Sequence, residues 1–330
     1  MSELTCKISI RKQSGQERGM GVKMNKYVIE TVDLTKKYKN QIAVDRLNLH
    51  VPKGQIYALL GRNGAGKTTT MKMLLNLIKP TSGSLYLFGK DYSDSEKDDY
   101  HRIGSIIEAP AFYENLTARE NLEILARLRG RHRRDTIEHA LCVVNLDKED
   151  KKRFREYSLG MKQRLGLAAA IMHEPELLIL DEPMNGLDPI GIHETRKYLL
   201  QLCRERGTTI FISSHVLNEI EQLADVIGVI NEGKLLEETS LQELYRQNRR
   251  YAEFEVSDVN RAALILERQF CVSDYAIIGN GILRLYERLD SRAEMNSSFV
   301  KDGITVSNVS IGAGKLEDYF TKLVGGEGIG

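Results

Sequence analysis

Tryptophan is absent from this chain of 330 residues, and cysteine and proline are scarce, with four and six residues. Long hydrophobic runs are missing as well. The segment from Leu165 to Met172 is among the longest, whereas a helix that crosses a bilayer needs about 18–20 consecutive apolar residues. The sequence therefore predicts no membrane-spanning helix, so any role at a membrane would be carried out from its surface.

An excess of charge of either sign is also missing. Lys plus Arg (47) nearly equals Asp plus Glu (46), which leaves a net charge of +1. Because nucleic-acid binding depends on concentrated positive charge, this balance gives no reason to expect nucleic acid as the main partner. The composition, 42% hydrophobic and 28% charged, is typical of a soluble globular protein with one large and one smaller domain.

The few cysteines stand far apart and form no CxxC pair, and no histidine stands at the spacing of a zinc ligand. Disulfide frameworks and structural zinc sites both need such groupings. We therefore favour four reduced cysteines of a cytosolic protein over a disulfide framework or a metal site. The four residues are Cys6, Cys142, Cys203 and Cys271.

The start of the chain has a composition of its own. Residues 1–24 are polar and basic and contain no apolar h-region, which argues against a signal peptide. Met20 and Met24 are both plausible alternative starts. We interpret this segment as a disordered or spurious leader, the alternative being a functional arm.

Residues 25–236 read as an alternation of short strands and helices, which is typical of an α/β fold with a parallel sheet covered on both faces. A helix is expected over Thr68–Ile78. A helical segment over Asn121–Met172 begins at the capping box Thr117–Glu120 and forms most of a helical subdomain of about residues 110–172. Strands are expected over Tyr27–Val32, Ile42–Val51, Gln55–Leu60, Leu177–Leu180, Thr209–Ser213 and Ile227–Asn231.

Beyond residue 236 the pattern changes, and residues 237–330 are expected to form a small C-terminal α+β domain. A hairpin is predicted around Asn280-Gly281, a pair that favours a tight turn between strands. The other elements expected here are strands over Tyr251–Val256 and Ile304–Ile311, a helix over Arg261–Phe270, and an amphipathic helix over Lys315–Leu323.

One glycine-rich segment carries the first chemical signal, because it fits the pattern GxxxxGK[ST] and stands between an expected strand and an expected helix. Its glycines let backbone N–H groups converge on phosphates, and the helix N-terminus adds partial positive charge. Lys67 is expected to reach the β- and γ-phosphates of ATP, and the Thr68 hydroxyl to bind Mg²⁺. The residues expected to contact the nucleotide are Gly61, Arg62, Asn63, Gly64, Ala65, Gly66, Lys67, Thr68 and Thr69.

Two adjacent carboxylates end the hydrophobic run Leu177–Leu180. A phosphate-binding loop supplies only one protein ligand to Mg²⁺, so a second element is expected. We expect Asp181 to hold Mg²⁺, directly or through water, and Glu182 to act as the general base that polarises the attacking water. The alternative is that two acids merely end a strand and cap a loop.

With these motifs in order, the sequence resembles the nucleotide-binding subunit of the ABC transporter family over about Tyr27–Leu236. Tyr157-Ser-Leu-Gly-Met-Lys-Gln163 stands where the family has its LSGGQ signature, and Gly186-Leu-Asp-Pro189 matches the D-loop. Tyr38 has the position of the aromatic residue that stacks on adenine; the alternative is a tyrosine packed at a strand edge. His215 has the position of the switch histidine that contacts the γ-phosphate, although an isolated histidine after a strand is more often structural.

The resemblance implies a P-loop NTPase fold, with a RecA-like core and a helical subdomain that carries the signature. It also implies a head-to-tail dimer, in which ATP and Mg²⁺ lie between one copy's phosphate loop and Ser158 and Gly160 of the other. Asp188 of the D-loop joins the catalytic set. The implied partner is a separate multi-span membrane permease, and the implied location is cytoplasmic, peripheral on the inner face of the cell membrane.

Two departures from the family pattern stand out. The signature reads YSLGM, and Glu108 stands where most members have the glutamine of the Q-loop. A carboxylate there can still ligate Mg²⁺ or orient water, so we expect Glu108 at the γ-phosphate side, near the metal. The alternative is a surface glutamate ahead of Pro110 with no nucleotide role.

Taken together, the departures resemble one branch of the family, the exporters of bacitracin, lantibiotics and similar antimicrobial peptides. The C-terminal Leu316-Glu-Asp-Tyr-Phe320 is also similar to the end of such subunits. Exporters of drugs, sodium or polysaccharides remain alternatives. So do a soluble ABC ATPase that acts on nucleic acid or the ribosome, and a subunit that binds ATP without hydrolysing it.

Overall fold

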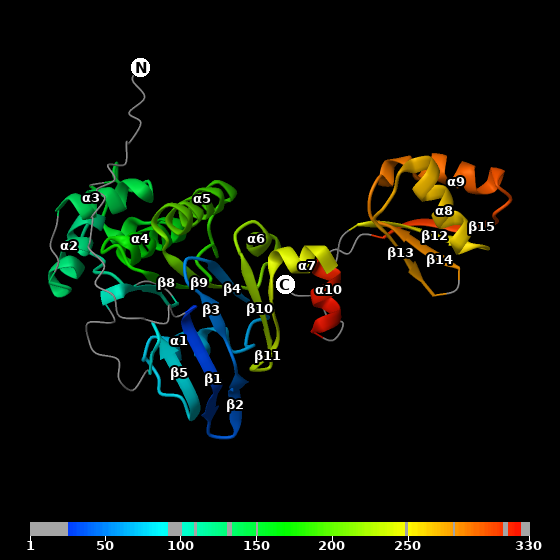
Figure 1. The fold of residues 1–330 in the computed structure, drawn as a ribbon. Helices are drawn as coiled ribbons and strands as arrows, with labels where there is room; N and C mark the ends of the chain where they lie inside the picture. Colours follow the sequence, from blue (N-terminus) through cyan, green and yellow to red (C-terminus); the bar gives the residue numbers. More distant parts are fainter. Residues whose placement is uncertain are drawn as a thin grey trace, which may run out of the picture.

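The computed structural model describes residues 26–91, 101–108, 111–130, 134–149, 151–247, 250–279, 281–312 and 316–324 (Figure 1). The expected leader, Pro110 and Asn280 lie outside these residues. Among the helices that the structure describes, none is both long enough and apolar enough to cross a membrane.

A six-stranded sheet forms the centre of the described structure, in the order β11-β10-β4-β9-β8-β7. Its strands pair in parallel except for β11, which runs antiparallel to β10. All residues of β4 (IYALL) and of β8 (LLILD) are buried, as a parallel sheet covered on both faces requires. The bounds are β4 Ile56–Leu60, β7 Ile103–Ile106, β8 Leu177–Asp181, β9 Thr209–Ser214, β10 Val226–Asn231 and β11 Lys234–Ser240.

The two faces of this sheet pack on different layers, because successive side chains of a strand point to opposite sides. On β4, Ile56, Ala58 and Leu60 belong to one buried cluster, while Tyr57 and Leu59 belong to another. The first cluster includes the helices α2 to α7. The second joins the sheet to α1 (Lys67–Leu74) and to the antiparallel sheet at the bottom of Figure 1.

The antiparallel sheet has the order β2-β1-β5-β6, with β3 also paired to β1. The expected strand Ile42–Val51 is interrupted after Leu47, and at the interruption the Asn48 side chain accepts a hydrogen bond from the Asp33 N–H (2.8 Å). Its two parts pair with different parts of β1, which continues past Val32 to Tyr38. The bounds are β1 Tyr27–Tyr38, β2 Gln41–Leu47, β3 His50–Pro52, β5 Ser82–Leu87 and β6 Lys90–Asp91.

Helices cover the other face of the central sheet. The expected capping box is present: Thr117 Oγ1 accepts from the Glu120 N–H, and the Glu120 carboxylate accepts from the Thr117 N–H. The expected helical segment consists of α2 Ala118–Leu128, α3 Arg134–Val143, the 3-10 turn η3 Phe154–Glu156 and α4 Leu159–Ile171; α5 Pro189–Arg206 and α6 Leu217–Glu221 follow.

The elements from β12 to β15 form a second unit, which we call the accessory unit. It is a four-stranded sheet in the order β13-β14-β12-β15, and it shares a buried cluster with the helices α8 and α9. Phe254 and Phe299 meet edge-to-face in this cluster. The hairpin expected around Asn280-Gly281 corresponds to β13 and β14. The bounds are β12 Tyr251–Val256, α8 Val259–Phe270, β13 Tyr275–Ile278, β14 Ile282–Leu285, η4 Leu289–Ser291, α9 Arg292–Lys301 and β15 Val306–Gly312.

The chain returns to the first and larger unit after the accessory unit. The division expected between residues 236 and 237 falls inside β11, and α7 (Leu241–Gln247) also packs on the core. The last helix, α10 (Leu316–Leu323), lies beside α7 in Figure 1. Phe320 is buried in the same cluster as Leu241 and Leu244, and the Tyr319 hydroxyl donates to Glu237. The described sheet unit is thus inserted between α7 and α10.

Candidate active site

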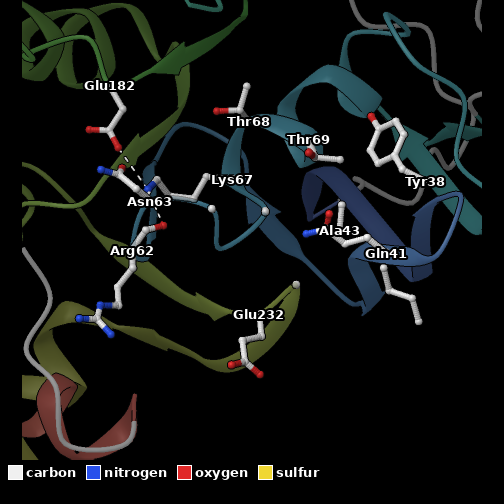
Figure 2. A pocket seen from close by; sticks show the side chains of 14 residues that line it. Tyr38, Gln41, Ala43, Arg62, Asn63, Lys67, Thr68, Thr69, Glu182 and Glu232 are labelled. Atoms are coloured by element: carbon white, nitrogen blue, oxygen red, sulfur yellow. Dashed lines mark hydrogen bonds and ion pairs between the residues drawn. The ribbon is translucent and has the colours of Figure 1, made fainter.

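A cavity of about 510 Å³ lies where the loop between β4 and α1 meets the antiparallel sheet and the turn between β10 and β11 (Figure 2). In this view Tyr38 and Glu182 lie at opposite sides, with Lys67 and Thr68 between them. The lining residues are Tyr38, Gln41, Ile42, Ala43, Arg62, Asn63, Gly64, Gly66, Lys67, Thr68, Thr69, Glu182, Glu232 and Gly233.

The loop has a backbone that only glycine allows at its last position. Gly66 has a φ of 109°, and a Cβ there would lie 2.6 Å from the carbonyl oxygen of Ala43. As N-cap of α1, Gly66 has no side chain to bond the first N–H groups of the helix. Those unpaired donors and the helix dipole form a site suited to phosphate.

Lys67 brings a buried cation to this loop. Its ammonium donates to the carbonyl oxygens of Gly61 (2.6 Å) and Arg62 (3.3 Å), and it lies 3.2 Å from Glu182 Oε1. A buried ammonium held mainly by neutral carbonyl groups attracts further negative charge. The phosphates of a nucleotide in the cavity can supply that charge.

Thr68 and Asp181 meet at the end of β8. The Thr68 hydroxyl donates to Asp181 Oδ2 (2.7 Å), and the Ser213 hydroxyl donates to Asp181 Oδ1 (2.6 Å). Threonine hydroxyl and aspartate carboxylate are oxygen donors, the type that Mg²⁺ prefers. The pair that the sequence predicts as metal ligands is therefore in contact and fits Mg²⁺ by its donor chemistry.

Glu182 stands at the centre of the polar contacts. Its N–H donates to Ser213 Oγ (2.9 Å), and its Oε2 lies 2.8 Å from His215 Nδ1. Its Oε1 is buried and has no hydrogen-bond partner among the described residues, although the Lys67 ammonium lies 3.2 Å away as an ion pair. The carboxylate of Glu182 is therefore held on both sides, by Lys67 at Oε1 and by His215 at Oε2.

A further carboxylate lies behind His215. Glu219, which belongs to α6, accepts a long hydrogen bond (3.4 Å) from the hydroxyl of Ser214 at the end of β9. Burial raises the pKa of Glu219, and the negative charge of Glu182 raises it further. Glu219 does not line the cavity.

Asp181 and His215 do not line the cavity themselves but contact the lining residues Thr68 and Glu182. In all, eight predicted site residues lie outside the lining: Gly61, Ala65, Glu108, Ser158, Gly160, Asp181, Asp188 and His215. Ser158 and Asp188 are N-caps, since Ser158 Oγ accepts from the Met161 N–H and Asp188 Oδ1 accepts from the Gly191 N–H. Gly160 follows Ser158 in the first turn of α4. The chain's own fold therefore does not bring the signature or the D-loop aspartate to its own nucleotide cavity.

Glu108 also lies outside the cavity lining. It is an exposed residue with a φ of 60°, and its Oε1 accepts from the Lys72 ammonium at 2.6 Å. This hydrogen bond raises the pKa of Lys72. A role for Glu108 at Mg²⁺ stays a prediction. The structure shows that its negative charge is paired with the Lys72 ammonium.

Sequence reasoning missed several residues that shape the site. Gln41, Ile42 and Ala43 of β2 line the cavity, as do Glu232 and Gly233. The Gly233 N–H donates to the carbonyl oxygen of Ala65, which ties the β10–β11 turn to the phosphate loop. Gly233, two residues after the predicted strand Ile227–Asn231, was a signal for a turn, but it did not indicate that the turn lies against the phosphate loop.

Together, the three-layer fold, the glycine loop and the carboxylates at the end of β8 define a P-loop nucleotide-binding ATPase. The profile of the family "ABC transporter" matches residues 44–185. The bacitracin transport ATP-binding protein BcrA of Enterococcus faecalis is 57% identical over 303 residues, which are 92% of this chain and 98% of that protein. The chain belongs to the ABC transporter family, as its motifs predicted, and is an ATP-binding ATPase of that family.

Two further comparisons agree with this membership. The lantibiotic transport ATP-binding protein SrtF of Streptococcus pyogenes is 46% identical over 209 residues, 63% of this chain and 89% of that protein. A solved structure of the ATP-binding subunit of an ABC transporter has a TM-score of 0.61 at 30% identity, over 67% of this chain and 92% of that one. The expected fold class is thereby confirmed.

Proposed function

We propose that this protein hydrolyses ATP, with Mg²⁺, to drive the export or removal of antimicrobial peptides of the bacitracin or lantibiotic type. The hydrolytic part rests on one cavity that is lined by Lys67, Thr68 and Glu182. Lys67 contacts Glu182 there, and Thr68 contacts Asp181 behind the lining. The cargo is inferred from the bacitracin transport protein, whose similarity covers 303 residues of this chain. Because the match covers 92% of this chain, it must include at least part of the accessory unit.

The roles of the side chains follow from their positions. The first N–H groups of α1 and the Lys67 ammonium bind the β- and γ-phosphates. Tyr38, half-exposed at the end of β1, offers a ring face to adenine. Thr68 and Asp181 hold Mg²⁺, which neutralises charge on the phosphates when bound.

Glu182 is the general base in this proposal. Its carboxylate accepts the proton of the attacking water, while the contacts of Oε2 with His215 and of Oε1 with Lys67 fix its orientation. Ser213 holds the backbone of Glu182 and the side chain of Asp181 at once. The base and the metal ligand are thus positioned by one hydroxyl group.

A second copy of the chain completes the site. Ser158, Gly160 and Asp188 do not line their own cavity, yet Ser158 stands at the start of α4, where a helix N-terminus suits a γ-phosphate. We infer a head-to-tail pair in which each ATP contacts the phosphate loop of one copy and the signature of the other.

The remaining partner is a multi-span permease on the membrane, with this chain on the cytoplasmic side. We propose no nucleic acid as a partner, in line with the near-zero net charge. Export of a drug, sodium or polysaccharide is the alternative within the same family.

Co-expression with candidate permease genes from the same genome tests the cargo. We expect cells with both proteins to resist bacitracin or a lantibiotic, and the purified complex to hydrolyse ATP faster with that peptide. The Glu182→Gln variant serves as the inactive control. Stimulation by an unrelated drug or by sodium, with none by the peptides, would refute the cargo but leave the ATPase assignment intact.

A further inference from the structure

We propose that Lys72 binds the Glu108 carboxylate in competition with Mg²⁺. The inference rests on the proposed function, because it assumes that Mg²⁺ binds at Thr68 and Asp181. It identifies Lys72 as a positioning residue, which no motif in the sequence marks.

The first support is geometric. Lys72 follows Thr68 by four residues on α1, so the two side chains share one face of the helix, about 5–6 Å apart. Glu108, which follows β7, bonds the Lys72 ammonium at 2.6 Å. The carboxylate is therefore held about one helical turn from the hydroxyl that is expected to bind the metal.

The second support is electrostatic. Asp181 and Glu182 already place two carboxylates at the metal end of the site, and a third one would be repelled while no metal or nucleotide offsets it. Electrostatic interactions with Tyr38 and Asp181 also raise the pKa of Lys72. Lys72 thus offsets the negative charge of Glu108, a charge that a glutamine at this position would not carry.

The third support is that this contact can be exchanged. The side chain of Glu108 is 64% exposed and that of Lys72 is 31% exposed, and ion pairs at such exposure add little stability. Glu108 also adopts a left-handed backbone conformation, which is unfavourable for a residue with a Cβ. A weak pair on a strained residue can give way when a divalent cation binds nearby.

The test uses the full chain and measures binding, not turnover. Mg²⁺ is titrated into wild type, Lys72→Gln, Glu108→Gln and the double variant, each with a non-hydrolysable fluorescent ATP analogue. Loss of an exposed ion pair corresponds to about a two- to five-fold change in an equilibrium constant. We expect Lys72→Gln to lower the Mg²⁺ concentration for half-maximal nucleotide binding by that factor.

The double variant separates this mechanism from general electrostatics, because removing any nearby positive charge favours Mg²⁺. In the Glu108→Gln background, Lys72→Gln should change the midpoint by less than in wild type. Equal shifts in both backgrounds, or no shift in either, would overturn the proposal. Lys234→Gln is the matched control: Lys234 pairs with Asp45 at 3.6 Å outside the cavity lining, so its midpoint should equal that of wild type.

The experiment distinguishes a failure of the proposed metal site from a failure of the proposed role of Lys72. If wild type shows no Mg²⁺-dependent nucleotide binding, the proposed metal site itself is wrong. If wild type binds normally and the two substitutions act independently, only the role of Lys72 is refuted. Thermal unfolding of all variants checks that each is folded.

Discussion

Ser213→Ala is the substitution for which the structure gives the most specific expectation. The Ser213 hydroxyl is fully buried at the end of β9, donates to Asp181 Oδ1 at 2.6 Å and accepts from the Glu182 N–H at 2.9 Å. Alanine fits the same strand but removes both hydrogen bonds. One substitution therefore loosens the metal ligand and the general base together.

The magnitude follows from the two groups that lose a partner. A buried polar group left unsatisfied costs about 1–3 kcal/mol, and Asp181 keeps one of its two hydrogen bonds, the one from Thr68 to Oδ2. We expect a loss of about 2–4 kcal/mol in the unfolding free energy of the ATPase core. Displacing a reacting group by about 1 Å can cost about 10²-fold in rate, so we expect the ATPase rate to fall by about 10- to 100-fold.

Ser214→Ala is the control, because it is the adjacent and equally buried serine. Its hydroxyl accepts from the Val216 N–H (2.9 Å) and contacts neither Asp181 nor Glu182. Denaturant unfolding and steady-state ATPase assays at several Mg²⁺ concentrations compare the two variants. Only Ser213→Ala should require more Mg²⁺. Wild-type stability and an unchanged Mg²⁺ requirement in Ser213→Ala would refute the reasoning.

Three other substitutions test separate parts of the account. Lys67→Ala removes the charge-assisted contact to the phosphates and should weaken nucleotide binding in calorimetry; unchanged affinity would disprove the phosphate-loop assignment. Ser158→Arg removes an N-cap worth about 1 kcal/mol, too little to unfold the chain, but it should abolish the ATP-dependent dimer of a Glu182→Gln background in size-exclusion runs. Phe320→Ala should cost about 3–5 kcal/mol in the unfolding of the ATPase core, because Phe320 is 1% exposed in that core's cluster; a loss confined to the accessory unit would contradict the docking of α10.

The parts of the fold that local sequence determines were predictable. β4, the glycine loop and α1 follow one another within twenty residues, and each has its own signal: a buried apolar run, glycines at fixed spacing, and a periodic helix. The Thr117 capping box has the same character. Such features need only neighbouring residues, so one sequence suffices to place them.

What could not be predicted depends on contacts between distant residues. At the break between β2 and β3, the Asn48 side chain bonds Asp33, fifteen positions earlier in the chain. The Glu108–Lys72 pair joins residues 36 positions apart, and the return of α10 places Phe320 beside α7 across the whole accessory unit. No periodicity or motif encodes these pairings, because they follow from how the layers pack. The same holds for Ser213, which looks like an ordinary strand residue until its neighbours are known.

The central claim is that Glu182 is the base of an ATP-hydrolysing site, and one substitution tests it most directly. Glu182→Gln keeps the shape of the side chain and an oxygen for the His215 contact, but it cannot take the proton of the attacking water. Steady-state ATP hydrolysis by the purified chain with its membrane partner should fall by about 10²–10⁴-fold, while ATP binding persists and an ATP-bound dimer accumulates. Near-normal hydrolysis by this variant would contradict the account.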